Sequence, residues 1–97
     1  VGLRQDLETN LKNLGEDKNK VIAEAEGLQG EYLLLEKLVE KYPDLAERKK
    51  KVSEDLKGKD RLIHLMTGRA QGITKSIQMI DTFEILEQES IDDYADA

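Results

Sequence analysis

The segment Glu40-Lys41-Tyr42-Pro43-Asp44-Leu45-Ala46-Glu47 determines how this chain folds, because it contains the only proline among 97 residues. Inside a helix, proline removes a backbone hydrogen bond and clashes with the preceding turn, at a cost of about 3 kcal/mol, whereas the first position of a helix tolerates it. The carboxylates of Asp44 and Glu47 suit the positive N-terminal end of a helix. The segment therefore predicts that one helix ends near Lys41 and that another begins at Pro43.

A heptad repeat of mostly apolar residues runs through the sequence on both sides of the proline. We denote the two core positions of each heptad a and d. Before the proline, the d residues are Leu7, Leu14, Val21, Leu28, Leu35 and Tyr42, and the a residues are Arg4, Leu11, Lys18, Ala25, Tyr32 and Val39. After it, the d residues are Leu45, Val52, Lys59, Met66, Ile73 and Ile80, and the a residues are Lys49, Leu56, Ile63, Ala70, Ile77 and Glu84. Such a repeat keeps one apolar stripe of a helix facing a partner helix. The pattern predicts helices over about 3–41 and 43–90, followed by an acidic tail over 91–97.

The two repeats are out of phase, because the d position moves from Tyr42 to Leu45 in three residues instead of seven. If the chain folds back at Tyr42–Asp44, the two stripes meet, Arg4 lies opposite Glu84, and no like charges are opposed. We therefore predict an all-α fold in which two long helices form an antiparallel coiled-coil hairpin.

The alternative is a parallel coiled-coil dimer of one long, kinked helix. Each core residue would then face its own copy, so that charged core residues would oppose like charges, among them Arg4, Lys18, Lys59 and Glu84. Like charges at core positions lower the stability of a coiled coil, and this favours the hairpin.

The composition indicates a single helical segment over residues 1–97. Apolar residues make up 38% of the chain and charged residues 37%, and aromatic side chains are scarce, as expected for long helices with a thin core. Because the chain starts at Val1 without a methionine, we expect it to be part of a larger protein.

A second set of apolar residues lies outside the a and d positions. The members that we expect to mediate association are Leu33, Leu34, Leu38, Phe83 and Leu86, and the others are Ile22, Leu62, Leu65 and Ile85. A single pair of helices would leave these side chains in water, and exposed apolar patches usually mark an interface. We therefore predict self-association into a helical bundle, and so a homo-oligomer.

The run Arg48-Lys49-Lys50-Lys51 is the most basic part of the chain and would lie at the tip of the hairpin. There it could contact an acidic partner surface. The net charge of −6 argues against nucleic-acid binding in general, which requires a positive field over the phosphates.

The sequence contains no pattern that points to catalysis, a cofactor or a metal. There is no cysteine, and the single histidine, His64, falls at an outer heptad position. No run of about 18 apolar residues is present, so we expect no membrane insertion. None of the three asparagines lies in a glycosylation sequon, which favours an intracellular origin.

These patterns together favour a structural, scaffolding coiled coil that mediates protein interaction and oligomerisation within a larger assembly. One alternative is a rod-like parallel dimerisation or spacer domain. The other is a helical adaptor whose basic tip binds an acidic partner surface.

Overall fold

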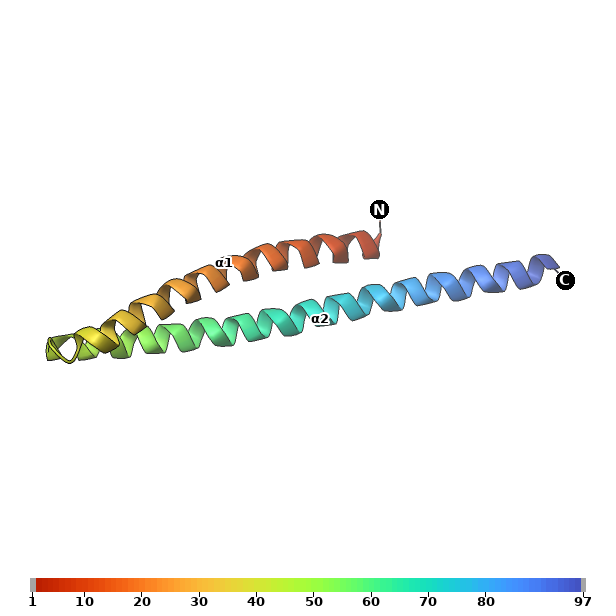
Figure 1. Ribbon diagram of the computed structural model, residues 1–97. Helices are drawn as coiled ribbons and strands as arrows, with labels where there is room; N and C mark the ends of the chain where they lie inside the picture. Colours follow the sequence, from red (N-terminus) through yellow and green to blue (C-terminus); the bar gives the residue numbers. More distant parts are fainter. Residues whose placement is uncertain (1, 97) are drawn as a thin grey trace.

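The computed structural model consists of two long helices and a short connection, with no strand among the residues that it describes. It describes the backbone of residues 2–96, and the burial and side-chain contacts of residues 2–87. Helix α1 spans Leu3–Leu38, the 3-10 helix η1 spans Pro43–Leu45, and helix α2 spans Ala46–Asp96. The molecule is elongated, with extents of 84 × 19 × 14 Å (Figure 1).

The chain reverses direction between α1 and α2, and proline provides the local cause. Tyr42 has φ −127° and ψ 82°, outside the helical region, as expected for the residue before a proline. The N–H groups of Lys41 and Tyr42 both donate to the carbonyl of Leu38, at 3.1 and 2.8 Å, and so close the last turn of α1. The N–H of Leu45 then donates to the carbonyl of Tyr42. Among the described residues none has a positive φ, so this reversal needs no glycine.

The helix boundaries differ from the predicted ones. Helix α1 ends at Leu38 rather than near Lys41, because the residues before Pro43 form a turn. The first residues after the turn form η1, so that α2 begins at Ala46 rather than at Pro43. At its other end α2 continues to Asp96, beyond the predicted end near Ser90. The backbone of 91–96 is therefore helical, and the last residue of the predicted tail over 91–97 lies outside the described residues. The sequence contains no proline or glycine after Gly72 that would end this helix.

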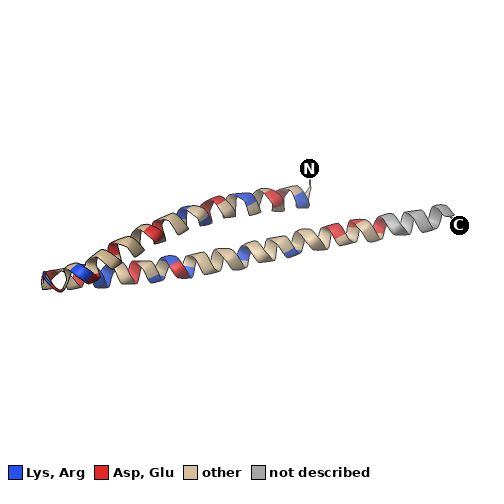
Figure 2. Cartoon of the chain, in the orientation of Figure 1, with Lys and Arg blue, Asp and Glu red and all other residues tan. Residues whose placement is uncertain are grey.

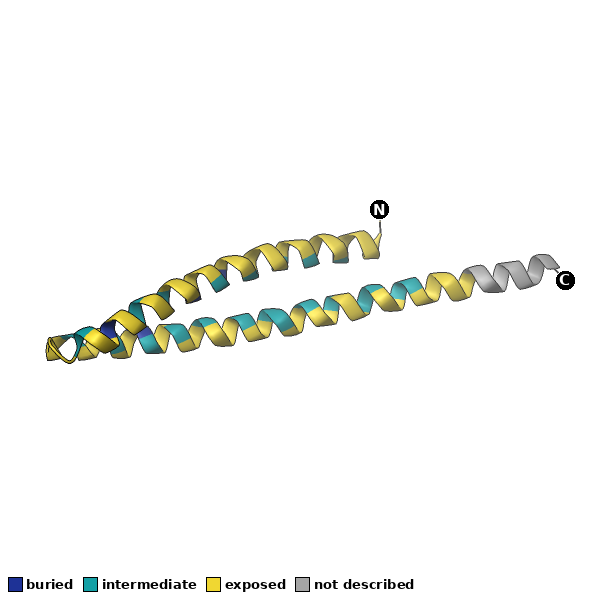
Figure 3. Ribbon diagram, viewed as in Figure 1, coloured by how far each residue is buried: buried dark blue, intermediate teal, exposed yellow. Residues whose placement is uncertain are grey.

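The least exposed residues form a stripe along the facing sides of the two helices (Figure 3). Every a and d residue from Leu7 to Val39, and every one from Leu45 to Ile80, is buried or half-buried. The most buried residues, with 5–9% of their surface exposed, are Val21, Ala25, Leu35 and Val52. Three residues at the ends of the repeats were also predicted for the core but are exposed: Arg4, Tyr42 and Glu84.

Helix α2 is longer than α1 and extends past its N-terminal end (Figure 1). The start of α1 lies beside Asp81, and all described residues after that position, 82–87, are exposed. This part of α2 therefore presents its apolar side chains to solvent.

Candidate interaction surface

Among the described residues, three ion pairs join α1 to α2 and show which parts of the helices lie side by side. Near the connection, the guanidinium of Arg48 donates to Glu31, with Nη2 2.6 Å and Nε 2.9 Å from Oε1. Further along, Lys59 Nζ lies 2.6 Å from Glu24 Oε2. At the far end, Arg4 Nε lies 2.9 Å from Asp81 Oδ1.

The partner of Arg4 differs from the predicted one by about one helical turn. We expected Arg4 to lie opposite Glu84, which would follow from a minimal turn at Tyr42–Asp44. Because α1 ends at Leu38, the connection is centred earlier in the sequence. If the centre of the turn moves by one or two residues along the sequence, the residue of α2 that lies opposite a given residue of α1 changes by about three. Arg4 consequently pairs with Asp81, three residues before Glu84.

The structure divides the predicted basic cluster into two halves. Arg48 is paired with Glu31, and Lys49 is half-buried, with its Nζ 5.6 Å from the centre of the Tyr32 ring. Both side chains therefore bind α1. Lys50 and Lys51 are exposed. These two lysines remain accessible, and so does much of the Arg48 side chain, which is 66% exposed.

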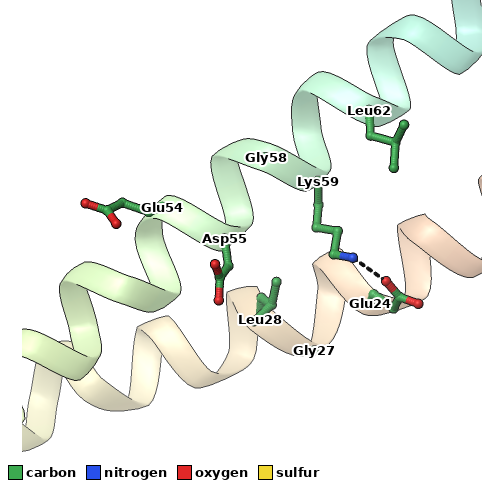
Figure 4. Close-up of a pocket in the computed structure, with 8 residues that line it drawn as sticks. All are labelled: Glu24, Gly27, Leu28, Glu54, Asp55, Gly58, Lys59 and Leu62. Atoms are coloured by element: carbon green, nitrogen blue, oxygen red, sulfur yellow. Dashed lines mark hydrogen bonds and ion pairs between the residues drawn. The ribbon is translucent and has the colours of Figure 1, made fainter.

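A shallow groove lies between α2 and the middle of α1, where the two helices run side by side (Figure 4). Leu28 points from α1 toward α2, and the pair Lys59–Glu24 closes one side, while Glu54 points away. Gly27 and Gly58 also line the groove. A Cβ atom added at either glycine would meet nothing within 4 Å, so the close packing of α1 and α2 does not require them.

The five residues predicted to mediate association fall into two groups. Leu33 and Leu34 are 50% and 57% exposed and lie near the turn, where Leu38 is half-buried. Phe83 and Leu86 are 66% and 54% exposed and lie near the far end of α2. The two groups are at opposite ends of the molecule, so they do not form one patch.

Our sequence interpretation missed one exposed apolar residue of α2. Met79 is 60% exposed, and it lies between Leu65 and Leu86 in a series that advances by seven residues. That spacing was visible in the sequence, but it belongs to heptad position c rather than to a or d. The exposed apolar residues of α2 thus have a repeat of their own.

His64 is exposed, and no group of three or more metal-ligating side chains gathers among the described residues. In the same part of the molecule, every buried side-chain nitrogen or oxygen has a hydrogen-bond partner. Neither helix, over its described residues, has a stretch long and apolar enough to span a membrane.

Figure 2 shows that charge is unevenly distributed along α2, with basic residues near the turn and acidic residues toward the far end. Comparison with protein-family models, with curated proteins and with solved structures finds no match to this chain. The surface itself is therefore the basis for a functional proposal.

Proposed function

We propose that this chain is a structural, scaffolding coiled-coil segment that mediates protein interaction and oligomerisation within a larger assembly, without a catalytic step. The observation that carries the proposal is the combination of two apolar surfaces. One is the stripe of a and d residues between α1 and α2, and the other is a set of large apolar side chains that remains exposed. A helix pair that buries one apolar surface and exposes another is suited to bind further helices.

The proposed architecture of the segment is an antiparallel coiled-coil hairpin. The ion pairs support it, because they join residues 17, 35 and 77 positions apart. In a continuous rod, residues 77 positions apart would be separated by about 115 Å, at about 1.5 Å per residue, so Arg4 could not reach Asp81 of its own chain. The half-buried a and d positions on both helices also fit knobs-into-holes packing.

Self-association follows from the small size of the core. Only four described residues are buried, whereas ten large apolar residues are exposed. At roughly 25 cal/mol per Å² of apolar surface, contact with another helix would add substantially to the stability of such a thin molecule. We therefore propose a homo-oligomer, with protein partners in the larger assembly.

Small-angle X-ray scattering combined with a mass measurement tests the architecture. The hairpin should give a longest dimension close to the 84 Å extent of the structure, extended only by any offset between copies. A parallel dimer of kinked rods, the spacer alternative, should be about 130 Å long, because a helix rises by about 1.5 Å per residue. Light scattering should give a multiple of 11.0 kDa. A particle as long as the kinked rod would contradict the hairpin, and a monomer at tens of micromolar would contradict self-association.

The exposed lysines near the turn favour a second candidate, an adaptor that binds an acidic surface. Lys50 and Lys51 are free to make such a contact, although Arg48 and Lys49 already bind α1. Replacing both free lysines with glutamate should abolish retention on anionic vesicles if this candidate is right. A matched control is the pair Lys12→Glu and Lys20→Glu, two exposed lysines of α1. Equal retention of both variants would reject the adaptor.

A further inference from the structure

Helix α2 carries a second heptad repeat, which lies beside the face that packs against α1. It occupies heptad positions c and g, and its residues follow one another at alternating intervals of three and four. These residues are Leu62, Leu65, Arg69, Gly72, Ser76, Met79, Phe83 and Leu86, and together they form the second stripe. Its five large apolar members are 41–67% exposed, and they are Leu62, Leu65, Met79, Phe83 and Leu86.

The second stripe belongs to a helix that already has one partner. The a and d residues of α2 lie against α1, whereas positions c and g lie on one flank of that contact. A helix with two adjacent heptad stripes is arranged to contact two helices at once, as helices in a bundle do. The stripe also continues past the start of α1, to residues that α1 does not cover.

We propose that the second stripe binds the second stripe of another copy of this chain, with the two α2 helices running in opposite directions about a two-fold axis that crosses the stripe between Gly72 and Ser76. This inference rests on the proposed self-association and specifies its interface. An isologous contact of this kind requires that one surface complement itself, and both side-chain size and charge meet that requirement.

The sizes of the side chains match when the stripe is aligned with itself in the opposite direction. Leu62 of one copy then faces Leu86 of the other, and Leu65 faces Phe83. At the centre, Gly72 faces Ser76, so the two backbones can approach closely where they cross the axis. A Cβ atom at Gly72 would meet nothing within 4 Å in its own chain, so contacts within that chain do not require glycine there.

The remaining layer of the alignment places Arg69 of one copy against Met79 of the other. The aliphatic part of an arginine can lie along an apolar side chain while the guanidinium stays in water. This layer therefore leaves no charge buried. The two ends of the stripe, where leucine meets leucine and leucine meets phenylalanine, provide most of the apolar contact.

Charge along α2 determines the direction of the contact. Residues 46–61 contain seven basic and four acidic residues, whereas 81–97 contain seven acidic residues and no basic one. Helices that run in opposite directions bring the basic segment of each copy beside the acidic segment of the other. Helices that run in the same direction would place the two acidic segments together, and like-charge juxtaposition is unfavourable.

Disulfide cross-linking in the full chain tests this interface, because the natural sequence contains no cysteine. The two variants are Leu65→Cys and Phe83→Cys, which are mixed before oxidation. Within one chain these positions are 18 residues apart on the same helix, or about 27 Å, so the bond can form only between copies. Adjacent thiols in a complex have an effective concentration near millimolar, so the mixed dimer should form on the order of 100-fold faster than a control.

The matched control is a mixture of Gln71→Cys and Gln78→Cys, two exposed positions of α2 that lie away from both stripes. Rapid linking of Leu65→Cys to itself would indicate helices running in the same direction and would overturn the inference. Linking at the control rate, while light scattering of the unmodified chain gives a dimer, would overturn this interface but leave the proposed self-association standing. A monomer in light scattering would overturn both.

Discussion

Arg4 occupies a core position of the heptad repeat, yet its side chain lies at the surface. Its guanidinium binds Asp81 on α2 at 2.9 Å and lies 3.6 Å from Glu8, one turn further along α1. The side chains of Arg4 and Asp81 are 47% and 41% exposed, and ion pairs with this exposure typically contribute about 0.2–1 kcal/mol. The pair therefore adds little stability, but it distinguishes one register of the two helices from another.

Arg4→Glu should lower the free energy of unfolding by about 1 kcal/mol or less, because it places a carboxylate beside Asp81 and Glu8. Adding Asp81→Arg should recover most of the loss. Adding Glu84→Arg in place of Asp81→Arg should recover little, since Glu84 is not the partner in the structure. Urea unfolding followed by circular dichroism measures all three variants, and rescue by Glu84→Arg alone would contradict the observed register.

Leu34 and Leu35 are adjacent residues that provide a matched test of burial. Leu35 is 5% exposed and Leu34 is 57% exposed. Leu35→Ala should lower the free energy of unfolding by about 2 kcal/mol or more, because it removes packed methyl groups between the helices. Leu34→Ala should change it by about 0.5 kcal/mol or less at concentrations where the chain is a monomer. Equal effects in thermal unfolding would contradict the assignment of the core.

At the scale of the elements, the apolar repeat predicted the less exposed face of each helix correctly. Every a and d residue between Leu7 and Val39 and between Leu45 and Ile80 is buried or half-buried, including the charged residues Lys18, Lys49 and Lys59. The repeat is a reliable signal because the same side of each helix faces the other wherever the two helices lie side by side. Helix ends carry no such repeated signal, so the predicted boundaries at Lys41, Pro43 and Ser90 differ from the structure.

The candidate surface was only partly predictable. The exposure of Leu33, Leu34, Phe83 and Leu86 follows from their positions outside the a and d repeat. The sequence did not predict which residues of the basic cluster would bind α1. The contact between Arg48 and Glu31 depends on the register of the two helices, and the register depends on where α1 ends. Local turn geometry thus controls which surface charges remain available.

Pro43→Ala should reduce stability by about 0.5–1 kcal/mol, because the substitution gives the unfolded chain more freedom. It should leave the longest dimension of the particle unchanged, since contacts along the whole length of α1 hold the two helices together. Circular dichroism and small-angle scattering of the same sample measure these two effects. A particle that lengthens toward the size of the kinked rod would mean that the proline alone maintains the reversal.

At the scale of the whole molecule, stability is distributed along a thin rod rather than concentrated in one core. Extents of 84 × 19 × 14 Å leave room for a single layer of side chains between the helices. Most layers are only half-buried, so each contributes modestly. A second copy placed along α2 would thicken the molecule and exclude water from the side chains that the first contact leaves exposed.

The position of the turn also determines the order in which we expect the contacts between α1 and α2 to form. The ion pairs close loops of increasing length, with partners 17, 35 and 77 residues apart. Because the entropy lost on closing a loop grows with its length, the contact nearest the turn should form first and the contact of Arg4 last. Hydrogen exchange should accordingly be slower for the amides of Leu35 and Val52 than for those of Leu7 and Ile80, and the reverse order would contradict this sequence of events. The helices then assemble from Pro43 outward, and the end of the molecule that holds Arg4 and Asp81 is the first to open.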